Sequence, residues 1–139
     1  MYESYTKQAL PEKEYRALLG SAICVFNSNF NFLIENILRT DPQKFEWGYL
    51  INLVGGNLLQ CLKDSAIAEA DEIVDLFDTL RMKRNRIVHS FQITNQEGLQ
   101  SLATRDRDGN QFEITEEYLM DFIEENERLC TLLHAYRGY

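Results

Sequence analysis

The sequence has no apolar run long enough to suggest a membrane protein. No stretch of the 139-residue chain approaches the roughly eighteen uninterrupted apolar residues of a membrane span. The first residues, Met1 to Ser4, also lack the basic-then-apolar layout of a secretion signal. We therefore expect a cytoplasmic protein that does not contact a membrane.

Cysteine is scarce, and so is positive charge. The three cysteines, Cys24, Cys61 and Cys130, are widely spaced among apolar neighbours, which is typical of reduced thiols in a core and argues against a disulfide framework or a zinc site. No metal or cofactor is expected. A net charge of −8 argues against broad binding to nucleic acid, because phosphate affinity depends on accumulated Lys and Arg. We expect no DNA binding, and any RNA must be bound locally.

Apolar residues recur every three or four positions in four segments, as they do along one face of an amphipathic helix. The pattern predicts helices over residues 12–39, 42–62 and 69–89, and from Glu116 nearly to the C-terminus, with Thr115 as the cap of the last helix. Hydrophobic residues make up 45% of the chain, enough for one core, and there is no repeat or linker. We expect one domain spanning residues 1–139.

Gly55 and Gly56 interrupt the second predicted helix. A phosphate-binding loop would need further glycine spacing followed by Lys and Ser or Thr, and Asn57 and Leu58 follow here instead. A kink, a close helix contact or a break between two shorter helices remain as interpretations.

Between the third and fourth helices the pattern becomes that of β-structure. Residues 91–94 are expected to be extended, and residues 102–107 and 111–114 flank Asp108-Gly109, a two-residue turn signal. The predicted fold is therefore all-α, an antiparallel four-helix bundle with a small β-hairpin inserted between helices three and four.

Basic residues gather at the end of the third helix. Arg81, Lys83, Arg84 and Arg86 supply four of the fourteen Lys and Arg residues within six positions, after an acidic run over residues 71–78. Acids near a helix start and bases near its end complement the helix dipole, which explains part of the clustering without any function.

Arg84 lies on the apolar stripe of this helix. A guanidinium cannot be neutralised to escape burial, so it must pair with a carboxylate, extend to the edge, or face a polar cleft or a subunit interface. A structural ion pair, for instance with Glu35 on the first helix, is the simplest alternative. Asn85 and His89 are four residues apart, about 40° around the axis, so their side chains can meet on one face. Taken alone, His89 is more typical of a helix cap than of a catalyst.

The run Arg84-Asn85-Arg86-Ile87-Val88-His89 resembles the motif of HEPN ribonucleases and toxins, an arginine and a polar residue followed by a short spacer and a histidine. Through architecture and helix pattern, the resemblance extends over about residues 12–137. It implies metal-independent RNA cleavage by a homodimer that packs through the third helix. His89 would transfer a proton, Arg84 would hold the phosphate, and Asn85 would orient His89 or the backbone.

Arg81, Lys83 and Arg86 are the expected RNA-binding residues, whereas the hairpin arginines Arg105 and Arg107 are interpreted as part of a solvated turn. None of the aromatic residues forms a recognisable base-stacking platform.

One histidine at the motif leaves the reaction without a second acid–base group, which a twofold dimer supplies. On an ideal helix Arg84 and His89 point about 140° apart, so either the helix loosens before His89 or the two residues act from different subunits.

The resemblance also bears on partners. HEPN toxins that pair with nucleotidyltransferase antitoxins carry a tyrosine two residues after the histidine, where this chain has Phe91, so modification at that position is excluded. The leading hypothesis is a toxin or phage-defence ribonuclease that acts on RNA, with an antitoxin or another protein as partner. The first alternative is a noncatalytic HEPN-type module that binds a nucleotide or a partner and dimerises. The second is a structural bundle whose motif is coincidental.

Overall fold

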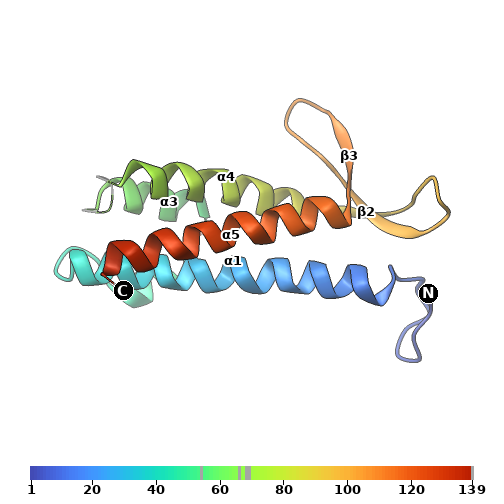
Figure 1. Cartoon of the computed structure of the whole chain (residues 1–139), viewed down its shortest axis with the longest axis horizontal. Coiled ribbons are helices and arrows are strands. Elements are labelled where there is room, and N and C mark those ends of the chain that lie inside the picture. The colour runs from blue at the N-terminus through green and yellow to red at the C-terminus, as the bar shows by residue number, and fades with distance from the viewer. Residues whose placement is uncertain (54, 66, 68–69, 139) are drawn as a thin grey trace.

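The computed structural model describes residues 1–53, 55–65, 67 and 70–138, and it is mostly helical with one small sheet (Figure 1). In chain order the elements are α1 (Lys13–Thr40), α2 (Trp47–Ile51), α3 (Gly55–Lys63), α4 (Asp71–Val88), β1 (Phe91–Thr94), β2 (Gln100–Arg105), β3 (Gln111–Ile114) and α5 (Glu116–Arg137).

The first and last predicted helices are confirmed. Helix α1 ends at Thr40, and α5 begins after Thr115, whose side chain accepts a hydrogen bond from the Tyr118 N–H at 3.0 Å, as expected of a cap. Helix α4 corresponds to the third prediction, although the predicted start at Glu69 lies outside the described residues. Asp71 and Glu72 occupy the first turn of α4 and Arg86 its last, which is the dipole-complementing arrangement.

The second predicted helix was wrong as a single element. The short α2 and the nine-residue α3 replace it, and Pro42 lies in a turn before α2 instead of opening a helix. Of the three interpretations of Gly55 and Gly56, the break between two shorter helices is confirmed, because α3 begins at Gly55. Val54, which the predicted stripe includes, lies outside the described residues. Two adjacent glycines weaken a helix interior, since their backbone loses more freedom on folding than that of other residues.

Helices α1 and α5 pack side by side and run in the same direction (Figure 1). The Phe26 and Phe122 rings are 6.2 Å apart, and further along both helices Asn29 donates to the backbone oxygen of Asn126 at 2.7 Å. Helix α4 runs the opposite way beside them. The predicted antiparallel four-helix bundle is therefore not confirmed. Because α3 is short, α4 is the one long helix that runs back between α1 and α5. With a single antiparallel helix between them in the chain, α1 and α5 run in the same direction.

The β-structure is a three-stranded antiparallel sheet in the order β1-β2-β3, so the predicted isolated hairpin is corrected. Phe91 pairs with Ala103, and Leu102 pairs with Ile114. The β2–β3 turn begins earlier than predicted, because the Asp106 N–H bonds to the Asn110 oxygen and closes a three-residue loop. Gly109 has a φ of 83°, the left-handed conformation that glycine adopts without strain.

Tyr15 joins the first helix to this sheet. Its buried hydroxyl donates to the Ile114 oxygen at 2.5 Å and accepts from the Leu102 N–H at 3.3 Å. The sheet is thereby held where α1 and α5 begin and α4 ends, at the end of the bundle nearer the N-terminus (Figure 1).

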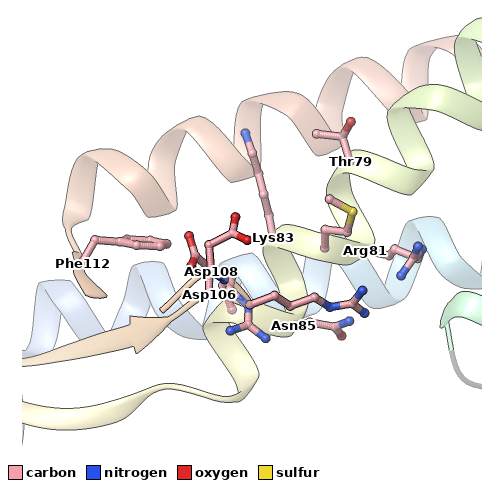
Figure 2. Close-up of a pocket in the computed structure, with 10 residues that line it drawn as sticks. Thr79, Arg81, Lys83, Asn85, Asp106, Asp108 and Phe112 are labelled. Atoms are coloured by element: carbon pink, nitrogen blue, oxygen red, sulfur yellow. Dashed lines mark hydrogen bonds between the residues drawn. The ribbon is translucent and has the colours of Figure 1, made fainter. Parts of the chain in front are cut away.

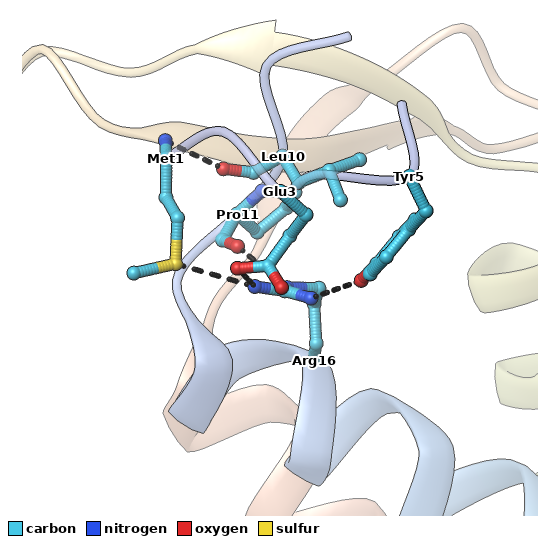
Figure 3. A network of polar contacts seen from close by, with 6 residues as sticks. All are labelled: Met1, Glu3, Tyr5, Leu10, Pro11 and Arg16. Carbon is cyan, nitrogen blue, oxygen red and sulfur yellow. Dashed lines mark hydrogen bonds and ion pairs between the residues drawn. The ribbon is translucent and has the colours of Figure 1, made fainter. Parts of the chain in front are cut away.

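The segment before α1 is bound to the same end. Arg16 donates to the Pro11 oxygen at 2.8 Å and to the Tyr5 hydroxyl at 3.1 Å, and forms an ion pair with Glu3 at 3.4 Å (Figure 3). Gln92 on β1 donates to the Ala9 oxygen at 2.6 Å, so this segment lies beside the sheet.

Helix α1 is long and apolar enough to cross a membrane by length and composition, a property that it shares with core helices of soluble proteins. In this fold its large apolar residues, among them Phe26, Leu33 and Ile37, pack into the core beside α4 and α5. Cys24 lies on its opposite, exposed face, so the prediction that this cysteine is a core thiol was wrong; Cys61 and Cys130 are half-buried.

Replacing Tyr15 with Phe should lower the free energy of unfolding by about 1–2 kcal/mol, because the buried Ile114 oxygen and Leu102 N–H lose their shared partner. Urea denaturation measures the change. Tyr49→Phe, at an exposed hydroxyl, is the matched control and should leave the midpoint in place. Equal midpoints for the two variants would contradict the role given to Tyr15.

Candidate active site

A cleft with a volume of about 470 Å³ separates the second half of α4 from the β2–β3 turn (Figure 2). We call it the α4–hairpin cleft. Figure 2 shows Arg81 at one end and Phe112 at the other, with Asp106, Asp108 and Asn85 between them. Its lining residues are Thr79, Arg81, Met82, Lys83, Asn85, Arg86, Asp106, Arg107, Asp108 and Phe112. The structure thus brings four of the six predicted site residues to one cleft.

The three basic residues from α4 already have partners inside the fold. Arg81 forms an ion pair with Asp78 at 2.8 Å, and Lys83 forms one with Glu125 on α5. Arg86 donates to the backbone oxygen of Arg105 and so holds β2 against α4. The Nε of Arg81 is buried and has no acceptor in the described part of the chain. These residues make the cleft locally basic in an acidic protein, but each of them also forms a contact within the fold.

The β2–β3 turn is ordered by Asp106. Its Oδ1 accepts from the N–H groups of Asn110 and Asp108, each at 2.9 Å, and these bonds, helped by the nearby charge of Arg86, lower the pKa of Asp106 below its ordinary value. Arg107 and Asp108 at the tip of the turn are exposed.

Sequence reasoning left Arg107, Asp108 and Phe112 out of the site. The alternation of arginines and aspartates in the turn resembles an ordinary solvated loop, and nothing in the local pattern says that the loop folds back over α4. Only the position of the sheet, which Tyr15 and Arg86 set, brings these residues to the cleft.

Arg84 lies outside the cleft lining and packs over the core. Its guanidinium carbon is 5.3 Å from the centre of the Phe26 ring, and its Nη1 donates to the Asn85 Oδ1 at 3.2 Å. The predicted alternative of an ion pair with Glu35 was wrong, because Glu35 pairs with Arg137. Among the residues that the structure describes, no carboxylate pairs with Arg84. Its stem is thus in the apolar stripe, as predicted, while its polar end reaches Asn85.

His89 stands just beyond the end of α4. The helix ends at Val88, and His89 adopts φ −95° and ψ 30° while its backbone N–H bonds to the Asn85 oxygen at 2.9 Å. Helix α4 is thus regular up to His89, whose N–H keeps the i−4 hydrogen bond, and the expected loosening before His89 is not seen. The His89 side chain is exposed. In the described chain no hydrogen bond joins its imidazole to Asn85, so the predicted meeting of these two side chains is not present.

Two exposed apolar side chains accompany this end of the helix. Met82 is 55% exposed and Val88 51%. At about 100° per residue they lie on either side of Asn85 around the axis. On this face Met82 and Asn85 line the α4–hairpin cleft, while the Val88 and His89 side chains beside them are exposed.

Taken together, the residues offer an exposed imidazole and an arginine that is oriented by an amide. Beside them lie three basic side chains in a cleft. Within residues 1–53, 55–65, 67 and 70–138, no group of three or more His, Cys, Asp or Glu residues is arranged to hold a metal ion.

No protein-family model, curated protein or solved structure matches this chain. The resemblance of the Arg84–His89 run to HEPN ribonucleases therefore depends on the motif and its place at the end of α4.

Replacing Arg84 with Ala should leave the protein folded and lower the free energy of unfolding by about 1 kcal/mol, the scale of a cation–π contact near a surface. Urea denaturation of Arg84→Ala beside Arg39→Ala, an exposed arginine at the far end of α1, makes the comparison. A loss of about 3 kcal/mol or more would instead indicate that Arg84 serves a buried ion pair and that its role is structural.

Proposed function

We propose that the protein is a metal-independent endoribonuclease of the HEPN type, acting as a homodimer in the cytoplasm. The observation that carries the proposal is the connected set at the end of α4. Arg84 is hydrogen-bonded to Asn85, which lines the basic cleft, and the exposed His89 lies one helical turn further on.

The reaction matches these groups. A neutral imidazole takes the proton from a ribose 2′-hydroxyl, and the oxygen attacks the adjacent phosphorus. The 5′-oxygen leaves with a proton from a second acid, so the products are a 2′,3′-cyclic phosphate and a 5′-hydroxyl. Arg84 would stabilise charge on the phosphorane, Asn85 would orient His89 or the backbone, and Arg81, Lys83 and Arg86 would hold the flanking phosphates.

A twofold dimer through α4 supplies the second acid. The exposed Met82 and Val88 on either side of Asn85 form an apolar surface that a second copy can cover. In such a pair the two His89 side chains lie at the dimer interface along α4, which we call the α4 seam. There one imidazole acts as base and the other as acid. At this interface the guanidinium of Arg84 would contact the phosphate while it remains over the Phe26 ring.

The biological setting that the resemblance favours is a toxin or phage-defence effector, with an antitoxin or another protein as partner. The alternative function is a noncatalytic HEPN-type module that binds a nucleotide or a partner and dimerises. One observation favours this alternative: neither Arg84 nor His89 lines the cleft of the single chain, which leaves the cleft suited to binding alone.

Purified protein should cleave cellular RNA in EDTA and leave 2′,3′-cyclic phosphate ends. His89→Ala should slow cleavage by about 10²- to 10⁴-fold, the usual contribution of a general acid–base group. His134→Ala, which removes the other histidine, is the matched control and should cleave normally. Full activity in His89→Ala would refute the mechanism, and an inactive wild type would favour the binding module.

Met82→Glu should weaken the dimer by at least about tenfold, because an unpaired carboxylate would be buried at the seam. Analytical ultracentrifugation measures the dissociation constant. Met120→Glu, the same change at an exposed position on α5, is the control and should dimerise like the wild type. If both variants remain equally dimeric, or the wild type is a monomer, the α4 seam is wrong.

A further inference from the structure

We propose that the β2–β3 turn is the second wall of the RNA site and that the α4–hairpin cleft takes one single-stranded nucleotide. Phe112 would stack on the base, and Arg107 would bind a phosphate. This inference rests on the proposed function and adds to it the β2–β3 turn and two of its neighbouring residues, Arg107 and Phe112.

The dimensions of the cleft suit one nucleotide. Its volume of about 470 Å³ lies within the range of ordinary small-ligand sites, about 300–1,000 Å³. A paired base is stacked within its helix and shows a protein only its edge, whereas an unpaired base can turn out and stack on an aromatic ring. A cleft that ends in an aromatic side chain therefore favours single strands.

Arg107 is the cleft cation that is easiest to recruit. Arg81 and Lys83 are in ion pairs, and Arg86 holds a backbone oxygen. Arg107 is exposed, and no hydrogen bond or ion pair of its side chain occurs in the described chain. A phosphate that binds it displaces no internal contact. The guanidinium also offers paired N–H donors that match phosphate oxygens.

Phe112 is held in place from behind. It is half-buried, and its ring lies 5.7 Å from that of Tyr118, tilted by 50°, while it also contributes to the cleft lining (Figure 2). The Phe112 ring is packed against Tyr118 and contributes to a cleft lined by basic side chains, and aromatic rings beside such charges are where bases stack. Asp106 does not compete for the phosphate-binding arginine, because its oxygens accept bonds within the turn.

The test measures binding separately from cleavage. Fluorescence anisotropy with a labelled single-stranded RNA octamer and with the same sequence as a duplex is performed in the His89→Ala background, in which cleavage of the probe should be slowed by about 10²- to 10⁴-fold. The single strand should bind more tightly. Phe112→Leu should weaken its binding by about tenfold, the scale of one base–aromatic stack. Arg107→Ala should reduce the slope of log K against log salt by about 0.7, the value for one phosphate contact.

Matched controls are Arg39→Ala and Tyr49→Leu, exposed positions outside the cleft that remove the same charge or an aromatic ring. Both should bind like the parent. Thermal melts establish that the variants are folded. If Phe112→Leu does not fold, Arg107→Ala decides the matter, because its side chain is exposed.

Parent-like binding by Arg107→Ala and Phe112→Leu overturns the inference, as does preferred binding of the duplex or no binding of RNA. The two proposals fail separately. Weakened binding in both variants together with an inactive wild type supports the cleft and refutes the ribonuclease. If the wild type is active, and Phe112→Leu and Arg107→Ala bind normally in the His89→Ala background and cut normally with His89 restored, the cleft alone is refuted.

Discussion

The rest of the structure depends on the contacts that the Phe26 ring makes with the rings of Phe77 and Phe122. Both ring pairs are 6.2 Å apart, with interplanar angles of 15° and 24°, and all three side chains are buried. Each ring comes from a different long helix, α1, α4 or α5. This one cluster therefore sets the positions of the three helices, and it determines which face of α4 remains at the surface.

The same ring supports the candidate site. Arg84 lies over Phe26, so its guanidinium is held at the edge of the core and not in solvent. A cation over an aromatic face keeps a favourable electrostatic contact without a carboxylate. Since no carboxylate neutralises Arg84 in the described chain, its charge remains available at the surface where Asn85 and His89 lie. The aromatic core thus positions a cation that an ion pair would have neutralised.

The anion site that we propose in this acidic chain depends on local charge. The net charge is −8, yet the cleft collects Arg81, Lys83, Arg86 and Arg107 against Asp106 and Asp108. Asp78 and Glu125 pair with Arg81 and Lys83, whereas acidic residues more than about 8–10 Å away are screened by salt and contribute little at the cleft. Binding there would be local and of modest salt dependence, which suits a short single-stranded segment better than a long duplex.

The sequence by itself determined the elements whose cause is local. The 3.6-residue period sets α1, α4 and α5, and the Thr115 cap starts α5. It also placed Arg84 on the apolar stripe and Asn85 and His89 on another face, because these positions follow from helix geometry.

Tertiary structure decided what depends on segments far apart in the chain. The parallel arrangement of α1 and α5 follows from the single return through α4, which no local pattern shows. The partner of Glu35 is Arg137, 102 residues away, and not Arg84. The β2–β3 turn reaches the cleft because Tyr15 and Arg86 hold the sheet against the helices. The residues in these contacts are far apart in the chain and belong to no common sequence pattern. Arg107 and Phe112 therefore reach the residues of α4 only when the chain is folded.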